Sequence, residues 1–388
     1  VLFRSASDGL TLPRDLDFHK DIARQNELWV INENNTGGRT HGGSTVTYYD
    51  AGLETQWADY RQDSYSGHFM HTASAIAISE NGTFANPLDV QDANNNNGYF
   101  TGPVLWPTDT SIYARVNQNG PLLGSHLDMI HQTPFGEGIA SAGENVYWVF
   151  DGFHSAIVKY DFVNPHAAGG EYHSDGLVWR HTDVVVQRQP GLSSHMEIDP
   201  ESGLLYIADT GNERIIRMDP NSGSIAGNLS PYGETLAGYY NMMGTDWEVV
   251  ADSNLNQPTG LDIYNGRLLV SDFSSGEIIV YDITQNPIVE LGRIETELTN
   301  EVMGIKVGPD GSIWFVCHND NELYQLTTLL MGDVNGDGNY SIMDVILCAQ
   351  YVMGLIDLDE DEEYRGDINF DETVNILDVL LIVDLVYN

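Results

Sequence analysis

The chain has 388 residues, which is enough for two or three domains. Its 16 Lys and Arg against 57 Asp and Glu give a formal charge of −41, which argues against binding to nucleic acid or to anionic membranes. No run of apolar residues is long enough to predict a transmembrane helix. Cys317 and Cys348 are the two cysteines, so a disulfide scaffold is excluded. We expect two independent thiols, with a Cys317–Cys348 bridge as the alternative.

The chain opens with Val1-Leu-Phe-Arg-Ser5, which looks like a cloning or sequencing remnant. We therefore expect that the biological N-terminus, with any signal peptide, is missing.

Residues 10–326 repeat one pattern of short strands at a period of roughly 45 to 60 residues. Five segments share an apolar strand core: 27–32, 145–151, 204–209, 267–272 and 312–317. A second strand follows each one, at 45–49, 156–160, 214–218, 277–281 and 322–326. A sixth, irregular unit opens at Ala75 and carries an Asn-rich insertion at 92–98. Short strands separated by Gly, Asn and Asp turns predict six radial sheets that close into a β-propeller.

Two segments, Gln257-Pro-Thr-Gly260-Leu-Asp and Ala208-Asp209-Thr-Gly-Asn212-Glu-Arg214-Ile, resemble NHL-type blades. This resemblance implies a six-bladed propeller over residues 1–328. The last unit stops after its third strand at Leu326. We therefore expect the residues before Pro13 to supply its outer strand, which removes an open sheet edge.

Each innermost strand of a propeller begins at a mouth of the central channel, where ligands usually bind. Asp15, Ala75 and His195 stand at this position in three of the repeats. His195 is therefore expected to face the channel, and His71 and His131 could converge with it on a transition metal. The alternative is that His195 is a hydrogen-bonded channel residue without a metal. Some NHL-type propellers are metal-dependent lyases or hydrolases, but the resemblance includes no identifiable catalytic set.

Two copies of one acidic pattern fill most of the C-terminal part, residues 329–388. In each copy, oxygen-bearing side chains stand at loop positions 1, 3, 5, 9 and 12, and position 7 offers its backbone carbonyl. This is the spacing by which a 12-residue loop wraps a calcium ion. The candidate ligands are Asp333, Asn335, Asp337, Asn339, Ser341 and Asp344 in the first loop, and Asp367, Asn369, Asp371, Thr373, Asn375 and Asp378 in the second. We expect two calcium ions.

The two copies differ at position 6, where the turn favours glycine. Gly338 meets this requirement and Glu372 does not, so the second loop is expected to be distorted or weaker. Apolar residues at helical spacing follow each loop, whereas no helix is expected to precede it. The acidic run 359–363 between the copies is expected to be a solvated linker.

This loop–helix unit, used twice over about residues 332–388, resembles the type I dockerin domain of bacterial multi-enzyme complexes. The resemblance implies two bound calcium ions and two helices that present a nearly two-fold symmetric face to a cohesin module. The partner contacts of that family lie at loop positions 10 and 11, often Ser-Thr. Here these positions are Ile342-Met343 and Ile376-Leu377. These four residues either contact a protein partner or pack against the body of the same chain.

The sequence therefore predicts a mainly β, secreted and non-catalytic assembly or binding protein at the surface of a prokaryote. Secretion is inferred because cytosolic calcium is too scarce to fill extracellular-grade sites. The calcium-loaded C-terminal part, residues 329–388, is called the tail below. It would anchor or polymerise the propeller through a cohesin-like receptor, a surface layer or a neighbouring copy in a filament. The propeller mouth could take a glycan or peptide. The alternative is a secreted metal-dependent lyase or hydrolase that uses the channel histidines.

Overall fold

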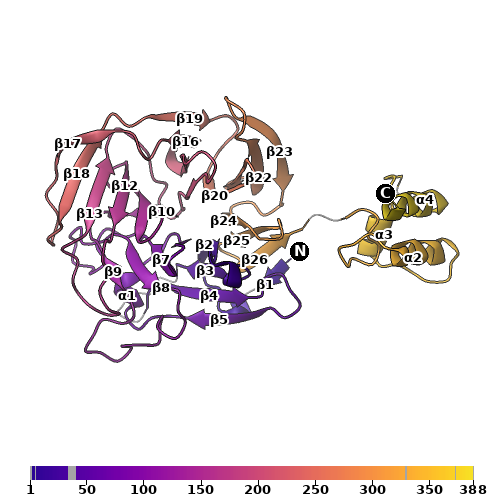
Figure 1. The fold of residues 1–388 in the computed structure, drawn as a ribbon, viewed down its shortest axis with the longest axis horizontal. Helices are drawn as coiled ribbons and strands as arrows, with labels where there is room; N and C mark the ends of the chain where they lie inside the picture. Colours follow the sequence, from indigo (N-terminus) through magenta and orange to yellow (C-terminus); the bar gives the residue numbers. More distant parts are fainter. Residues whose placement is uncertain (1, 5, 34–40, 328–329, 372, 388) are drawn as a thin grey trace. The chain divides into compact units, whose positions relative to one another are not determined.

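The computed structural model describes residues 2–4, 6–33, 41–327, 330–371 and 373–387. It divides into two compact units, Val1–Leu326 and Thr327–Asn388. The larger unit is a ring of six β-sheets, the blades of a propeller (Figure 1). The smaller unit contains three α-helices among its described residues.

The blades follow one another in chain order, and the first four strands of each blade, named here from the innermost outward, pair antiparallel. Blade one contains β2 (Pro13–Phe18), β3 (Leu28–Asn32), β4 (Ser44–Tyr49) and β5 (Trp57–Arg61). Blade two contains β6 (Ala77–Ile78), β7 (Thr83–Asn86), β8 (Val104–Pro107) and β9 (Asp128–Met129). Blade three begins with β10 (Gly136–Ser141), β11 (Val146–Asp151), β12 (Ala156–Asp161) and β13 (Leu177–His181).

Blade four contains β14 (Met196–Ile198), β15 (Leu205–Asp209), β16 (Arg214–Met218) and β19 (Trp247–Ala251). Blade five contains β20 (Pro258–Tyr264), β21 (Arg267–Asp272), β22 (Glu277–Asp282) and β23 (Val289–Glu295). Blade six contains β24 (Val302–Val307), β25 (Ile313–Cys317), β26 (Glu322–Leu326) and β1 (Leu2–Arg4). The connections carry the short helix α1 (Ser66–Phe69) and the 3-10 turns η1 (Ala6–Asp8), η2 (Ile22–Arg24) and η3 (Thr210–Asn212).

In three blades the second strand buries a tryptophan: Trp29, Trp148 and Trp314. These rings lie in the apolar layers between neighbouring blades. The innermost strands approach one another closely around the channel. A Cβ atom at Gly138 would lie 1.8 Å from the carbonyl oxygen of Ser194 in the next blade, so only glycine fits there.

The outer strand of blade six comes from the start of the chain. Leu2 pairs with Tyr324 and Arg4 with Leu323, antiparallel, so the N-terminal segment closes the ring as predicted. Leu2–Arg4 belong to the five residues that looked like a remnant, yet they form a strand. This pairing covers the edge of β26, which would otherwise expose unpaired backbone groups.

Blade three is wider than the sequence analysis predicted. Its outer strand β13 pairs in parallel with β18 (Gly238–Met243), which pairs in turn with β17 (Ser224–Asn228). This hairpin lies in the sequence between β16 and β19 of blade four (Figure 1). The third and fourth blades are therefore interlocked by chain that leaves one sheet, extends its neighbour and returns.

The smaller unit has the helices α2 (Ile342–Val352), α3 (Glu360–Gly366) and α4 (Ile376–Tyr387). Its core consists of Val334, Cys348, Val379 and Ile382. The prediction of a linker at 359–363 was wrong: Asp359 and Glu362 form a capping box that starts α3, and acidic residues favour the first turn of a helix. Consequently the second loop, unlike the first, does follow a helix.

Both cysteines are buried free thiols. Cys317 lies in the core between blades five and six, and Cys348 lies in the core of the smaller unit. Burial raises the pKa of the Cys348 thiol to about 11, so it is protonated and unreactive near neutral pH. No helix in the described part of the chain is long and apolar enough to cross a bilayer.

Candidate functional site

The first acidic loop is closed by two buried carboxylates that accept hydrogen bonds from its backbone. Asp333, at position 1, accepts from the N–H groups of Gly338 (2.7 Å) and Asp337 (3.1 Å). Asp344, at position 12, accepts from those of Asn335 (3.1 Å) and Ser341 (2.8 Å). The bond to Ser341 is also half of the capping box that starts α2. Loop closure and helix initiation therefore depend on the same aspartate.

The second loop repeats this arrangement. Asp367 accepts a hydrogen bond from the N–H of Asp371 at 3.1 Å. Asp378 is fully buried and accepts from Asn369 (3.3 Å) and Asn375 (2.9 Å). At position 4, Phe370 has a φ of +57° where the first loop has Gly336 at +69°. A bulky residue in this left-handed region is strained. The departure predicted at Glu372 lies outside the described residues.

The donor set of both loops suits a hard cation. Each loop offers three aspartates, two asparagines and a hydroxyl, and calcium takes six to eight oxygen ligands in irregular geometry. In the first loop Gly338 has a φ of +83°, as the sharp turn at position 6 requires. The chemistry of these residues therefore fits calcium.

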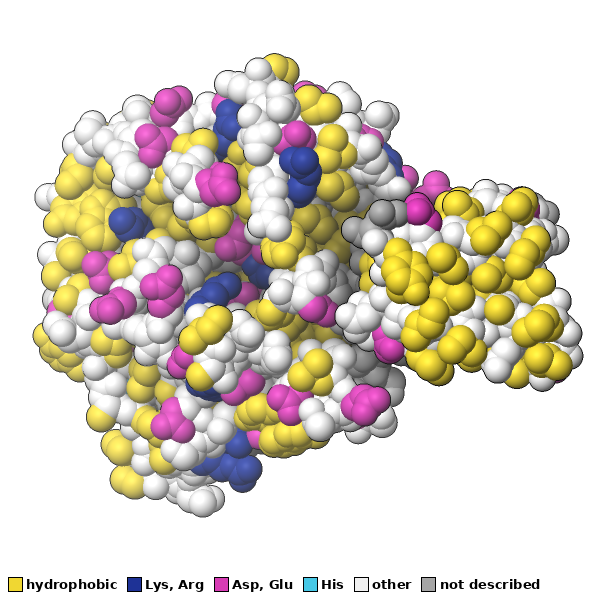
Figure 2. All heavy atoms as spheres, turned by 45° about the vertical axis from the view of Figure 1, so that its right-hand side comes forward, with side chains coloured by type: hydrophobic (Ala, Val, Ile, Leu, Met, Phe, Trp, Pro, Cys, Tyr) yellow, Lys and Arg dark blue, Asp and Glu magenta, His cyan; other side chains and the backbone are white. Residues whose placement is uncertain are grey.

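Apolar side chains at matching positions project from the starts of α2 and α4. Ile342 and Met343 are 51% and 50% exposed, and Ile376 and Leu377 are 59% and 55% exposed. Figure 2 shows hydrophobic side chains over much of the visible face of this unit. A contiguous apolar surface of this kind usually marks a protein interface.

The central channel of the propeller contains buried aspartates that have a structural task. The innermost strand of each described blade is an edge strand of its sheet and faces the channel. Asp15, Asp17 and Asp262 accept hydrogen bonds from the backbone N–H groups of the next blade, at Ile76, Ile78 and Val307, at 2.7 to 2.8 Å. These carboxylates satisfy edge groups that would otherwise be buried unpaired.

The structure does not bring His71, His131 and His195 together. His195 faces the channel, where its Nδ1 lies 3.2 Å from Asp15. Burial and the charges of Lys306 and Arg14 lower the pKa of His195 to about 3. His71 hydrogen-bonds to Thr72. His131 follows β9, the outermost strand of blade two, and therefore lies at the outer edge of that blade. The three imidazoles thus have different surroundings.

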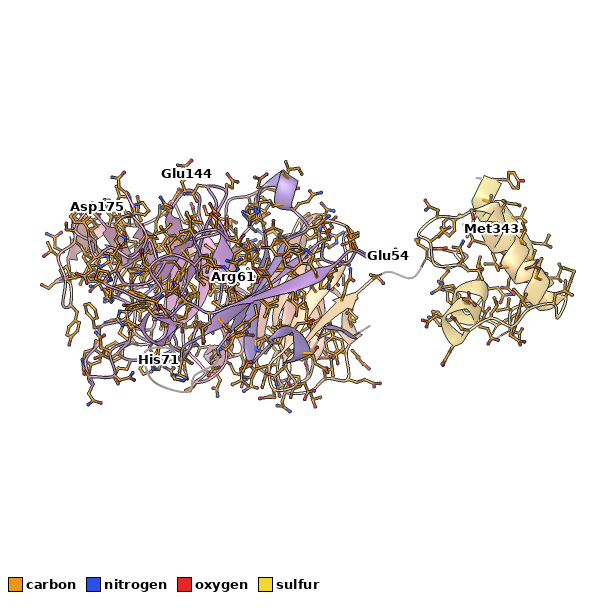
Figure 3. The ribbon with its side chains drawn as sticks, turned by 90° about the horizontal axis from the view of Figure 1, so that it is seen from below. Glu54, Arg61, His71, Glu144, Asp175 and Met343 are labelled. Atoms are coloured by element: carbon orange, nitrogen blue, oxygen red, sulfur yellow. The ribbon has the colours of Figure 1, made fainter. Side chains whose placement is uncertain are left out.

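The two ends of the channel carry different charged groups. Figure 3 shows the propeller from the side, with His71 labelled on one face and Glu144 on the other. Toward the Glu144 face, Lys306 forms ion pairs with Asp262 (3.0 Å) and Glu197. Toward the His71 face, the fully buried Arg14 contacts the carboxylates of Glu33 (3.1 Å), Glu137 (3.3 Å) and Asp89 (3.5 Å). Burial and the charge of Asp89 raise the pKa of Glu137 well above its usual value.

Sequence reasoning missed a second cluster of histidines. A cavity of about 440 Å³ at the outer edge of blade two is lined by His68, His126, His131 and His173, with Phe100 and Glu234. Burial lowers the pKa of His126 well below its usual value and that of His68 to about 4, so both are neutral at pH 7. The one local signal for this cluster is His126-x-Asp128-x-x-His131, three ligand-type residues around a short strand.

The profile of the dockerin type I domain matches residues 331–386. The chain therefore combines a six-bladed β-propeller with a C-terminal dockerin type I domain. Domains of this type bind calcium, assemble with cohesin partners and occur in extracellular and cell-surface proteins. No protein with a curated description matches the chain.

Several solved propellers share the fold of the larger unit. An auxiliary nutrient binding protein from Bacteroides ovatus has a TM-score of 0.51 at 10% identity and covers 82% of this chain and 69% of its own. Its counterpart from Bacteroides thetaiotaomicron has a TM-score of 0.50 at 11% identity, over 81% and 68%. A glucose dehydrogenase has a TM-score of 0.50 at 12% identity, over 84% and 99%. At these identities the likeness shows the propeller fold alone.

Proposed function

We propose that this chain is a secreted, non-catalytic binding protein whose propeller is attached to a cohesin-type module through a calcium-loaded tail. The observation that carries the proposal is the pair of equivalent loops, each followed by a helix that begins with two exposed apolar residues. The two pairs, Ile342-Met343 and Ile376-Leu377, occupy the same positions in the two repeats. A partner that contacts one pair would find nearly the same surface at the other.

Calcium would hold each loop in the shape that positions these residues. Asp333, Asn335, Asp337, Asn339, Ser341 and Asp344 would bind one ion, and Asp367, Asn369, Asp371, Thr373, Asn375 and Asp378 a second. Bound calcium supplies the positive charge that lets three aspartates lie close together in each loop. The last aspartate of each loop also bonds the backbone at the start of a helix, so loss of the ion would disturb α2 and α4 directly.

The apolar pairs also decide what kind of partner is expected. The dockerin family often has Ser-Thr at these positions, and this chain has four larger apolar residues. We therefore propose a cohesin-type surface with an apolar centre, because exposed apolar side chains gain most from burial against other apolar groups. Contact with a neighbouring copy or with a surface layer would use the same residues.

Isothermal titration with a panel of type I cohesin modules tests the proposal. In millimolar calcium we expect a one-to-one complex with the full chain, and no binding after chelation. A variant with Ile342→Glu and Met343→Glu should keep at least part of the affinity, because the second pair remains. Adding Ile376→Glu and Leu377→Glu should abolish binding. Ile225→Glu, at an exposed site on β17, is the matched control and should bind normally.

Size-exclusion chromatography with light scattering separates the possible partners. A monomer in calcium that binds a cohesin module supports the cohesin proposal. Calcium-dependent growth of the particle with concentration, abolished by the same four substitutions, would instead show that the tail polymerises the chain. A monomer that binds no cohesin module of the panel in calcium would contradict both.

A further inference from the structure

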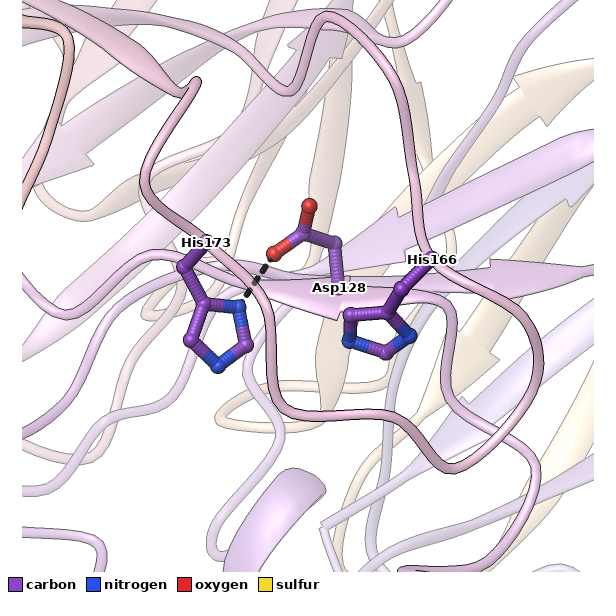
Figure 4. A group of neighbouring side chains, drawn as sticks. All are labelled: Asp128, His166 and His173. Carbon is purple, nitrogen blue, oxygen red and sulfur yellow. Dashed lines mark hydrogen bonds and ion pairs between the residues drawn. The ribbon is translucent and has the colours of Figure 1, made fainter.

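One group of side chains with metal-ligand spacing lies beside the histidine-lined cavity at the edge of blade two, and His173 belongs to both. Among the described residues, Asp128, His166 and His173 are the three His, Cys, Asp or Glu side chains whose ligand atoms all lie within 4.8 Å of one another (Figure 4). Asp128 lies on β9, and both histidines lie in the loop between β12 and β13. The described lining of the central channel includes none of the three, so this site is independent of the channel histidines.

Within the described part of the chain, three buried atoms around this group have no hydrogen-bond partner: Oδ2 of Asp128, Nε2 of His131 and Nε2 of His166. The other polar atom of each side chain is already bonded. Asp128 Oδ1 lies 2.6 Å from His173 Nδ1, His131 Nδ1 lies 2.9 Å from Glu234, and His166 Nδ1 lies 2.9 Å from the carbonyl of Ala167. Because a buried polar atom without a partner is costly, several of them close to one another point to a missing ligand.

These bonds also decide which atoms can bind a metal. A ring nitrogen that faces a carbonyl or a carboxylate carries the proton, so the opposite nitrogen has a lone pair. In His166 and His131 that opposite atom is the unpartnered Nε2. A carboxylate or carbonyl behind an imidazole is also the arrangement that orients histidine ligands in metal sites and raises their basicity.

We propose that Asp128, His166 and His173 bind one divalent transition-metal ion of the zinc type. Two imidazoles and one carboxylate are a ligand set for zinc or ferrous iron, whereas calcium prefers oxygen alone. The ion would replace the proton shared by Asp128 and His173. Ligand atoms about 2.1 Å from one ion lie roughly 3 to 4 Å apart, so small side-chain rotations bring the three into place. The fourth position would face the cavity, on the side of His131.

The loop that carries both histidines is held in place by its backbone. The N–H of His166 donates to the carbonyl of Leu127 (3.1 Å), and the N–H of Gly169 donates to that of His126 (2.8 Å). Gly169 has a φ of +80°, and a Cβ there would lie 2.7 Å from the oxygen of Gly124. A Cβ at Gly170 would lie 2.8 Å from the His166 ring. These contacts fix the backbone of the loop around His166 before any ion binds, which favours affinity.

Cobalt titration tests the proposal on the full chain. The protein is stripped with a chelator, returned to millimolar calcium and titrated with Co²⁺, whose visible ligand-field bands report the coordination geometry and ligand type. We expect one equivalent of Co²⁺ to bind and to be displaced by Zn²⁺. His166→Ala and His173→Ala should each weaken binding by at least tenfold. His154→Ala should not, although it too removes an imidazole paired with an aspartate, Asp151 at 2.8 Å.

Asp128→Asn keeps the shape of the side chain and removes its charge. Loss of Co²⁺ binding in this variant can therefore be distinguished from loss of the folded structure. It should also weaken Co²⁺ binding at least tenfold while the melting temperature without metal stays within a few degrees. No stoichiometric Co²⁺ binding, or binding unchanged in His166→Ala and His173→Ala, would overturn the proposal. Cohesin binding in calcium should be normal in all these variants, so this site and the tail fail or succeed separately.

Discussion

Arg14 forms ion pairs that connect several blades. Its guanidinium contacts carboxylates from blades one, two and three, and its Nε donates a hydrogen bond to Ser193, which precedes blade four, at 3.1 Å. Removing one partner of a buried ionic network leaves the other charges without compensation. We expect Arg14→Met to lower the free energy of unfolding by about 3 to 5 kcal/mol, measured by urea denaturation followed by tryptophan fluorescence.

Arg293 provides the matched control at the surface. It also contacts two carboxylates, Glu290 at 2.8 Å and Glu277 at 2.9 Å, but it lies on the exposed strand β23. Exposed ion pairs contribute about 0.2 to 1 kcal/mol each, so Arg293→Met should change the unfolding free energy by about 1 kcal/mol or less. Equal losses in the two variants would show that burial of Arg14 has no special effect.

The burial of His181 makes the stability of the propeller depend on pH. It is buried against Trp148, with ring centroids 5.2 Å apart, and burial lowers its pKa from 6.5 to about 4. The unfolded chain therefore binds more protons than the folded chain between pH 6.5 and pH 4. The stabilisation from neutral His181 is present above pH 6.5 and is lost as the pH falls toward 4, by up to about 3 kcal/mol.

Comparison with His181→Gln isolates this contribution from that of other buried groups. The difference in unfolding free energy between the native chain and the variant should shrink as the pH falls from about 7 to about 4, because the glutamine side chain does not titrate. Urea denaturation at several pH values measures this difference. A constant difference would show that His181 keeps its ordinary pKa in the folded state.

At the scale of elements, β1 is a very short strand with an essential position. It pairs with β26 through two residue pairs, and without it the edge of β26 would be open. We expect removal of residues 1–6 to lower the melting temperature of the propeller by several degrees, because hydrogen bonds and cover for one sheet edge are lost. Calorimetry measures the shift.

Light scattering of the same truncated chain gives a second readout of β1. An uncovered β26 edge should make it associate on heating earlier than the full chain does. An unchanged melting temperature and no association would mean that β1 contributes nothing to closure.

The local elements were predictable because they depend on short-range pattern. The strands at 214–218 and 322–326 were placed at the bounds that the structure has, since apolar alternation between turn residues needs no tertiary information. The β17–β18 hairpin was missed as an extension of blade three, because its parallel pairing with β13 joins segments far apart in the sequence. The run at 359–363 was predicted to be a linker because of its negative charge. The prediction was wrong because it did not consider the capping box formed by Asp359 and Glu362.

For the whole molecule, chelation of calcium should unfold the tail and leave the propeller folded. If an ion binds with micromolar affinity and calcium is millimolar, binding stabilises the tail by roughly 4 kcal/mol. The two units can be observed separately, because all seven tryptophans lie in the propeller while the long helices lie in the tail. Chelator should remove the helical circular dichroism and leave tryptophan fluorescence unchanged.

Asp333→Ala combined with Asp344→Ala should mimic chelation in the first loop alone, because the two residues provide its positions 1 and 12. The helical signal should fall by about half in calcium, and the remainder should disappear with chelator. A helical signal that persists in the variant or in chelator would contradict a tail held together by calcium.

The functional sites differ in how far the sequence could reveal them, for the same physical reason as the strands. The calcium-type loops consist of consecutive residues, so their spacing alone indicates the donor set. The cluster of Asp128, His166 and His173 joins a strand of blade two to a loop of blade three. Only the packing of the two blades brings these residues together. The choice of histidines by repeat position selected His71, His131 and His195 instead, of which His131 alone lies near this cluster.

The burial of Arg14 has a consequence for what a ligand in the channel would meet. Arg14 and Glu137 are entirely inaccessible to solvent, so a ligand cannot contact this pair while the native packing is kept. The cavity that reaches His195 is lined instead by Lys306, Lys20 and Glu197. A small molecule held beside His195 would therefore meet the ammonium groups of two lysines before any other positive charge of the channel.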